Sequence, residues 1–174
     1  MIRPATFHDI PQLKKLLDLS VRGLSKEHYT PNQIESALKY IFGIDTQLIT
    51  DGTYYVVELD QVIAGCVGWS MRNTLYGDDQ HKGLEDPLLD PENDAARIRA
   101  FFVHPDYARK GIGRQIMELC EREAKKNGFS SMELGATLPD IPLYIAMGFS
   151  ETYSLAEPLP DGEKLELAIM RKVL

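Results

Sequence analysis

The residues best suited to chemistry lie in a basic, glycine-containing segment at positions 103–114, Val-His-Pro-Asp-Tyr-Ala-Arg-Lys-Gly-Ile-Gly-Arg. Gly111 and Gly113 have no Cβ atom, so their backbone N–H groups can approach a phosphate closely. A pattern typical of an amphipathic helix follows, and the unpaired amides and positive dipole at the start of a helix attract anions. Three cations surround this helix start: Arg109, Lys110 and Arg114. The segment therefore predicts a site for a phosphate-containing ligand.

Two well-known phosphate loops do not match this segment. A dinucleotide-binding loop needs a third glycine three residues after Gly113, but the chain has Ile116 there. A Walker loop needs Gly-Lys followed by Ser or Thr, which the segment lacks. A Gly-x-Gly before a helix can also be an ordinary tight turn, so the segment alone does not separate a phosphate site from a structural turn.

Three motifs in register resemble the GNAT superfamily of acyl-CoA-dependent N-acetyltransferases. The Val-His-Pro turn at 103–105 and the Gly-Ile-Gly at 111–113 match the turn and the acetyl-CoA loop of that family. Residues 144–149, Tyr-Ile-Ala-Met-Gly-Phe, are similar to its Tyr-x-x-x-Gly-Phe motif, and residues 131–136 predict the strand between them. The chain departs from the family at Ala108, where Arg or Gln is usual, with an arginine one residue later.

The resemblance implies an α/β fold in one N-acetyltransferase-like domain spanning residues 1–174. Its sheet is expected to be mixed and mainly antiparallel, with six to seven strands, helices on both faces, and a splay between the fourth and fifth strands. Hydrophobic periodicity and capping patterns predict a compatible order of elements. The expected strands are 1–5, 53–60, 62–70, 98–103, 131–136 and two within the tail 153–174. The expected helices follow Thr6, Thr30, Gly111 and Asp140, with the Asp140 side chain as a cap.

The composition is ordinary for a soluble globular protein, with 26% charged and 44% hydrophobic residues. No apolar run approaches the roughly 18 residues of a membrane-spanning helix. The net charge of −7 argues against a nucleic-acid partner, whereas the local basic cluster suits an anionic cofactor. The first residues show no apolar signal segment, and Cys66 and Cys120 occupy apolar positions. We therefore expect a cytoplasmic protein with both thiols in its core.

Residues 71–95 are rich in Asp, Gly, Pro and Asn and show no apolar periodicity, so they predict an unusually long loop. Long ordered loops are often functional, and a lid over the substrate is one interpretation. A flexible insertion or a dimer contact is the other, and nothing in the sequence separates the two.

The resemblance also implies the reaction, in which an amine attacks the thioester of acetyl-CoA directly and CoA leaves as a thiolate. It implies that the amides of residues 109–114 hold the pyrophosphate and that residues 101–103 pair with the pantetheine arm like an added strand. The expected cofactor-binding residues are Phe101, Phe102, Val103, Arg109, Lys110, Gly111, Ile112, Gly113 and Arg114. Tyr144 is the expected catalytic residue, which supplies a proton or a hydrogen bond to the thiolate.

The sequence does not single out a base that takes the proton of the incoming ammonium. Six side chains are candidates, directly or through water: Glu58, Asp78, Asp79, His81, His104 and Glu133. His104 also suits the Val-His-Pro turn, and Glu133 alternates with apolar residues as a solvent-facing strand residue does. The four histidines lack paired ligand spacing, so no metal site is expected.

The expected acceptor is a primary amine, carried by a small molecule such as a polyamine, amino acid or antibiotic, or by a protein. Members of the family often dimerise, although no exposed apolar stripe in this sequence indicates a homodimer. Two other functions stay open at this point. One is a non-catalytic acyl-CoA-binding regulatory module, which Ala108 and the unassigned base would fit. The other is a flavin- or nucleotide-binding switch that uses the same phosphate site.

Overall fold

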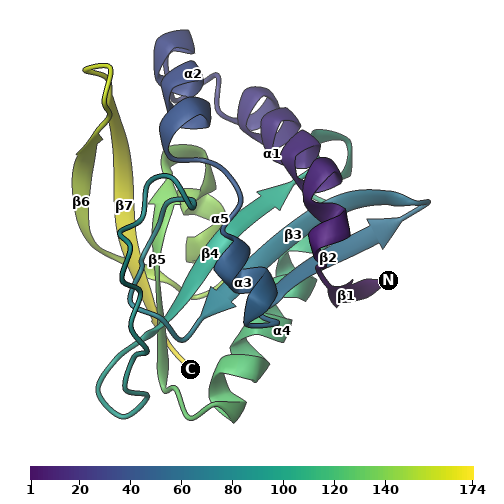
Figure 1. Cartoon of the computed structure of the whole chain (residues 1–174), viewed down its shortest axis with the longest axis vertical. Coiled ribbons are helices and arrows are strands. Elements are labelled where there is room, and N and C mark those ends of the chain that lie inside the picture. The colour runs from purple at the N-terminus through teal and green to yellow at the C-terminus, as the bar shows by residue number, and fades with distance from the viewer.

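The computed structural model describes residues 1–174 and contains one seven-stranded sheet in the order β1-β2-β3-β4-β5-β7-β6 (Figure 1). The strands are β1 (Ile2–Pro4), β2 (Tyr54–Leu59), β3 (Val62–Ser70), β4 (Ala96–Val103), β5 (Ser131–Thr137), β6 (Ser150–Pro158) and β7 (Lys164–Val173). Every neighbouring pair is antiparallel except β4 and β5, which run parallel. The predicted mixed, mainly antiparallel sheet is therefore confirmed.

Five α-helices cover both faces of the sheet, as predicted. They are α1 (Ile10–Leu24), α2 (Pro31–Tyr40), α3 (Thr46–Thr50), α4 (Ile112–Lys126) and α5 (Ile141–Ala146). Helices α1, α2 and α3 lie on one face, and α4 and α5 lie on the other (Figure 1). Strand alternation explains this arrangement, because Val56 and Cys66 pack toward α1 and α3, whereas Val57 and Val67 pack toward α4. None of the helices has the length and apolar composition needed to cross a membrane.

A capping interaction explains where α2 begins. Thr30 Oγ1 accepts a hydrogen bond from the Gln33 amide at 3.2 Å, and the Gln33 side chain accepts one from the Thr30 amide at 2.9 Å. The predicted side-chain cap of α5 is wrong, because the Asp140 carboxylate instead accepts a hydrogen bond from the Thr137 hydroxyl at 2.7 Å. Helix α3 has no counterpart among the predicted elements, since five residues are too few to show helical periodicity.

Strands β4 and β5 separate soon after they meet. Their ladder ends at Arg97 opposite Glu133, and β4 continues to Val103 without a partner on that side. The register between β3 and β4 shifts near Ala100, whose φ of 49° lies in the left-handed region that is unusual for alanine. The predicted splay between the fourth and fifth strands is thus confirmed, and it leaves one edge of β4 open for a ligand.

Candidate active site

A groove of about 510 Å³ runs along the open edge of β4. Its walls come from the end of α1, the segment that follows α1, the residues before α4, and the starts of α4 and α5. Eight of the nine predicted cofactor-binding residues line it: Phe101, Phe102, Val103, Arg109, Gly111, Ile112, Gly113 and Arg114. The ninth, Lys110, lies outside the groove with its Nζ 5.1 Å from the centre of the Tyr107 ring.

The backbone N–H groups of residues 109–114 donate no hydrogen bond within the chain. They lie at the start of the 15-residue helix α4, whose N-cap residue is Gly111 with a φ of 81°. A Cβ atom on Gly111 would meet nothing within 4 Å, so the glycine is required by its backbone conformation and leaves open space beside the loop. Six unpaired donors at the positive end of a helix are able to bind an anion.

Gly113 has a different role, which concerns packing. A Cβ atom at this position would lie 2.8 Å from Cζ of Phe101, so only glycine allows the Phe101 ring to lie against the first turn of α4. The Phe101 ring in turn contacts the Tyr144 ring, with their centroids 5.7 Å apart. Gly113 and Tyr144, the residue predicted to be catalytic, are therefore connected through one aromatic side chain.

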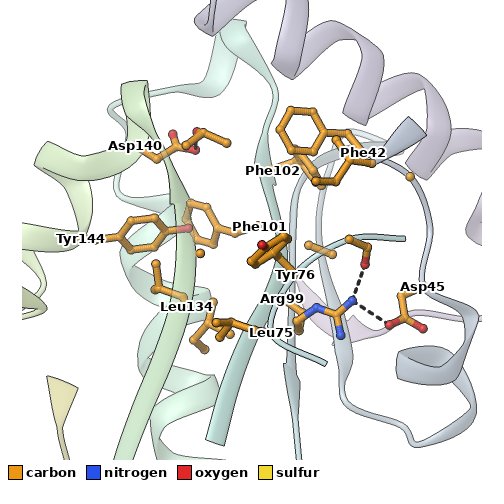
Figure 2. A pocket seen from close by; sticks show the side chains of 17 residues that line it. Phe42, Asp45, Leu75, Tyr76, Arg99, Phe101, Phe102, Leu134, Asp140 and Tyr144 are labelled. Carbon is orange, nitrogen blue, oxygen red and sulfur yellow. Dashed lines mark hydrogen bonds and ion pairs between the residues drawn. The ribbon is translucent and has the colours of Figure 1, made fainter. Parts of the chain in front are cut away.

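A second, smaller pocket of about 80 Å³ adjoins the groove (Figure 2). The two cavities share five lining residues: Phe42, Phe101, Phe102, Thr137 and Asp140. Tyr144 lines only the small pocket, together with residues of β4, β5 and the segment 75–77. A ligand in the groove can therefore meet a ligand in the pocket where Phe101 and Asp140 lie.

Tyr144 is almost fully buried, with 4% of its surface exposed, and its ring packs between Phe101 and Phe149. Its hydroxyl makes no hydrogen bond within the chain and is directed toward the interior of the pocket (Figure 2). Burial, and secondarily the nearby Asp140 carboxylate, raise the pKa of Tyr144 well above its usual value. The phenol therefore stays protonated at neutral pH and is available as a hydrogen-bond donor.

The other charges of the small pocket are already paired. Arg99 lies 2.9 Å from Asp45, and both side chains are only 2% exposed. Arg99 also donates a hydrogen bond to the Gly77 carbonyl (Figure 2) and another to the Thr74 carbonyl. Lys82 donates one to Asp45 at 2.7 Å. Burial lowers the pKa of Arg99, but the adjacent carboxylate keeps the guanidinium charged. The hydrogen bonds from Arg99 to these two carbonyls tie the segment that follows β3 to β4.

Part of the long loop 71–95 forms a wall of the pocket. Leu75, Tyr76 and Gly77 line it, and the Tyr76 hydroxyl donates a hydrogen bond to Glu157 on β6 at 2.8 Å. His81 contacts the same carboxylate through Nε2 at 2.8 Å. The part of the loop nearest the sheet is thus tied to β6, and its residues 75–77 limit the size of the pocket.

None of the six candidate bases lines either cavity. Glu58 forms an ion pair with Arg3 at 3.0 Å, and Glu133 forms one with Arg97 at 3.5 Å. The remaining four are likewise held by other partners: Asp78, Asp79, His81 and His104. The carboxylate that does line both cavities is Asp140, four residues before Tyr144 and so on the same face of α5.

Comparison with known proteins identifies the class of protein that this fold and site define. Residues 14–149 match the model of the Acetyltransferase (GNAT) family. The match spans most of the chain, so the chain belongs to the GNAT acetyltransferase family and is an acetyl-CoA-dependent N-acetyltransferase. No curated protein matches the chain in sequence.

Solved structures share this fold at low sequence identity. A GCN5-related N-acetyltransferase from Rhodopseudomonas palustris superimposes with a TM-score of 0.74 at 18% identity, covering 100% of this chain and 95% of its own. The PaiA N-acetyltransferase from Thermoplasma acidophilum, solved in complex with coenzyme A, gives 0.62 at 16% identity over 100% and 98% of the chains. A ribosomal-protein-alanine N-acetyltransferase from Brucella melitensis gives 0.64 at 20% identity over 100% and 99%.

Proposed function

We propose that this chain transfers the acetyl group of acetyl-CoA to a primary amine that enters the small pocket, by direct attack with both substrates bound. The junction of the two cavities supports this most strongly. The groove beside the unpaired amides and the pocket beside Tyr144 share Phe101, Thr137 and Asp140. Holding both reactants at one junction converts a bimolecular reaction into an effectively unimolecular one.

Several parts of the chain would hold the donor. The amides of residues 109–114 bind the pyrophosphate, and the free edge of β4 at residues 101–103 pairs with the pantetheine arm. Arg109 and Arg114 are exposed at the rim of the groove and add positive charge there. Lys26, which follows α1, lines the groove as a third cation that the sequence did not indicate. The positive charge of Lys26 compensates for Ala108, which lines the groove without a polar side chain at the position where the family usually has Arg or Gln.

Tyr144 assists the departure of CoA in this proposal. Acetyl-CoA supplies a thioester, whose leaving group is a thiolate that needs a hydrogen bond or a proton. The Tyr144 hydroxyl has no competing partner within the chain, and its raised pKa keeps the phenol protonated. A high phenol pKa makes complete proton transfer to a thiolate unfavourable, so Tyr144 acts mainly by donating a hydrogen bond.

The pocket restricts the acceptor to a narrow group. Its walls are largely apolar, with Phe42, Leu75 and Leu134 among them, and a volume of about 80 Å³ admits an amino group and a few carbon atoms. The acceptor is therefore a small aliphatic amine or the amine-bearing end of a longer molecule.

An acceptor screen tests this proposal. Purified protein is incubated with acetyl-CoA and, in turn, propylamine, phenethylamine, spermidine, lysine methyl ester or a peptide with a free N-terminal alanine. CoA release is followed with a thiol reagent, and the acetylated product is detected by mass spectrometry. Propan-1-ol, which has the size of propylamine without its amine, is the control. Amine-dependent CoA release supports the proposal, whereas acetyl-CoA binding without CoA release for any of these amines contradicts it.

A further inference from the structure

Asp140 occupies the point at which the groove and the small pocket meet. It lines both cavities, and Figure 2 shows it above Tyr144 on the wall formed by the start of α5. Its carboxylate accepts a hydrogen bond from the Thr137 hydroxyl at 2.7 Å, and no basic side chain lies within ion-pair distance of it. Asp45, in contrast, is paired with Arg99. Asp140 is thus the unpaired acid of the pocket.

The proposed reaction needs such a group. A primary amine is an ammonium ion at neutral pH, since the pKa of an unperturbed lysine is about 10.4, and an ammonium ion cannot attack a thioester. The pocket that receives it must bind the cation and remove one proton. Burial raises the pKa of Asp140 above its usual value, against the opposing effects of Thr137 and His28, and this makes the carboxylate a stronger base than an exposed aspartate.

We infer that Asp140 binds the ammonium group of the acceptor and accepts its proton, an inference that rests on the function proposed above. The ammonium gives one proton to the Asp140 carboxylate and becomes a neutral amine. Its nitrogen then forms a bond to the acetyl carbon as the carbon–sulfur bond breaks. The second proton lost by the nitrogen ends on the CoA sulfur near Tyr144, and Asp140 returns its proton to solvent. The products are the acetamide, CoA as a thiol, and one proton.

The inference also defines the substrate class. The pairing of Asp45 with Arg99 leaves the Asp140 carboxylate as the uncompensated charge on the pocket wall. The pocket therefore favours a cationic amine on an uncharged stem and disfavours an amine with a carboxylate a few bonds away.

The pH dependence of Asp140→Asn tests the inference. Asparagine keeps the size of the side chain and can still accept the Thr137 hydrogen bond. We expect kcat/KM for the best acceptor to fall about 10²- to 10⁴-fold at pH 7. The remaining activity should rise about tenfold per pH unit, because the variant must capture the small fraction of neutral amine in solution. The wild-type profile should be flat between the pKa of Asp140 and that of the amine.

Asp161→Asn is the matched control, because Asp161 also accepts a side-chain hydroxyl, that of Ser36 at 2.8 Å, but lines neither cavity. It should leave the pH profile unchanged. A loss of equal size at every pH for Asp140→Asn, or no loss, would overturn the inference while leaving the proposed function intact. Absence of amine-dependent CoA release by the wild-type protein would instead refute the proposed function, and the inference with it.

Two further measurements separate Asp140 from its neighbours. The titratable groups that face it are His28 and Tyr29, which follow α1, and Tyr144 on α5. In the wild-type profile, kcat/KM should fall at low pH as Asp140 becomes protonated, and we call this fall the acidic limb. Thr137→Val removes the hydrogen bond that stabilises the carboxylate, so the acidic limb should move to higher pH. His28→Gln should retain the acidic limb. Without any substrate, the difference in unfolding free energy between wild type and Asp140→Asn should change over the pH range of the same limb. Loss of the limb in His28→Gln would contradict the assignment.

Discussion

Replacement of Gly111 by aspartate should abolish most acetyl-CoA binding without a matching loss of stability. Gly111 has a φ of 81°, and an added Cβ atom would meet nothing within 4 Å. Gly162, in the turn between β6 and β7, has a φ of 90° and equally open surroundings. An aspartate at either position should lower the unfolding free energy by a similar amount, about 1 kcal/mol, because of the positive φ. Gly162→Asp is therefore a matched control for folding.

The two variants differ in what the new carboxylate faces. At Gly111 it lies beside the unpaired amides of residues 109–114, where we expect the pyrophosphate. Two like charges 4 Å apart repel by about 1 kcal/mol in water and about 4 kcal/mol near a protein surface, which corresponds to roughly 5- to 1000-fold weaker binding. Gly111→Ala adds the Cβ atom without the charge and should lie between wild type and Gly111→Asp.

Isothermal titration calorimetry with acetyl-CoA measures the affinities, and thermal unfolding without ligand measures stability. Wild type and Gly162→Asp should bind alike, and both aspartate variants should lose a similar amount of stability. Unchanged affinity of Gly111→Asp would refute the assignment of the phosphate site. An equal loss of affinity in Gly162→Asp would show that the effect comes from folding.

Three other outcomes are expected. Tyr144→Phe should lower kcat by up to about 10²-fold in the amine assay. The unfolding temperature should change little, because the Tyr144 hydroxyl has no partner within the chain. An unchanged kcat would contradict the proposed role of Tyr144. β-Alanine should show a kcat/KM at least about 10-fold below that of propylamine, since its carboxylate is repelled in the pocket. Asp9→Asn should cost about 2 kcal/mol of unfolding free energy at neutral pH, because the Arg3 hydrogen bonds at 2.8 Å hold the pKa of Asp9 well below its usual value. That stabilisation is present above the ordinary aspartate pKa of 3.8 and is lost as the pH falls below it, so urea unfolding of the two proteins should converge in acid.

Local features of the chain could be predicted from the sequence because their causes are local. The Thr30 capping box forms as expected, and the hairpin at 54–70 follows from runs of β-forming residues with a short turn between them. The glycine-containing loop at positions 103–114 and the apolar face of α4 are likewise visible as local patterns in the sequence. These elements differ from the predicted boundaries by only a few residues, for example β4 beginning at Ala96 rather than Ile98.

The small pocket could not be predicted, because it depends on contacts between distant segments. Its walls combine Phe42, residues 75–77, Arg99 and Asp140, which meet only after the sheet has formed and β4 has separated from β5. The bend in β4 centres on Ala100, which is not a residue type associated with positive φ. For the same reason the sequence indicates only a helix cap at Asp140. Its position four residues before Tyr144 is visible in the sequence, but its exposure to two cavities is not.

A crystal structure of the protein with coenzyme A and the best acceptor from the screen would show whether the two substrates meet beside Tyr144 and Asp140. We expect the pyrophosphate on the amides of residues 109–114, the sulfur within hydrogen-bond distance of the Tyr144 hydroxyl, and the acceptor nitrogen against the Asp140 carboxylate. A nitrogen held by another base, or a sulfur placed away from the junction of the groove and the pocket, would contradict this expectation.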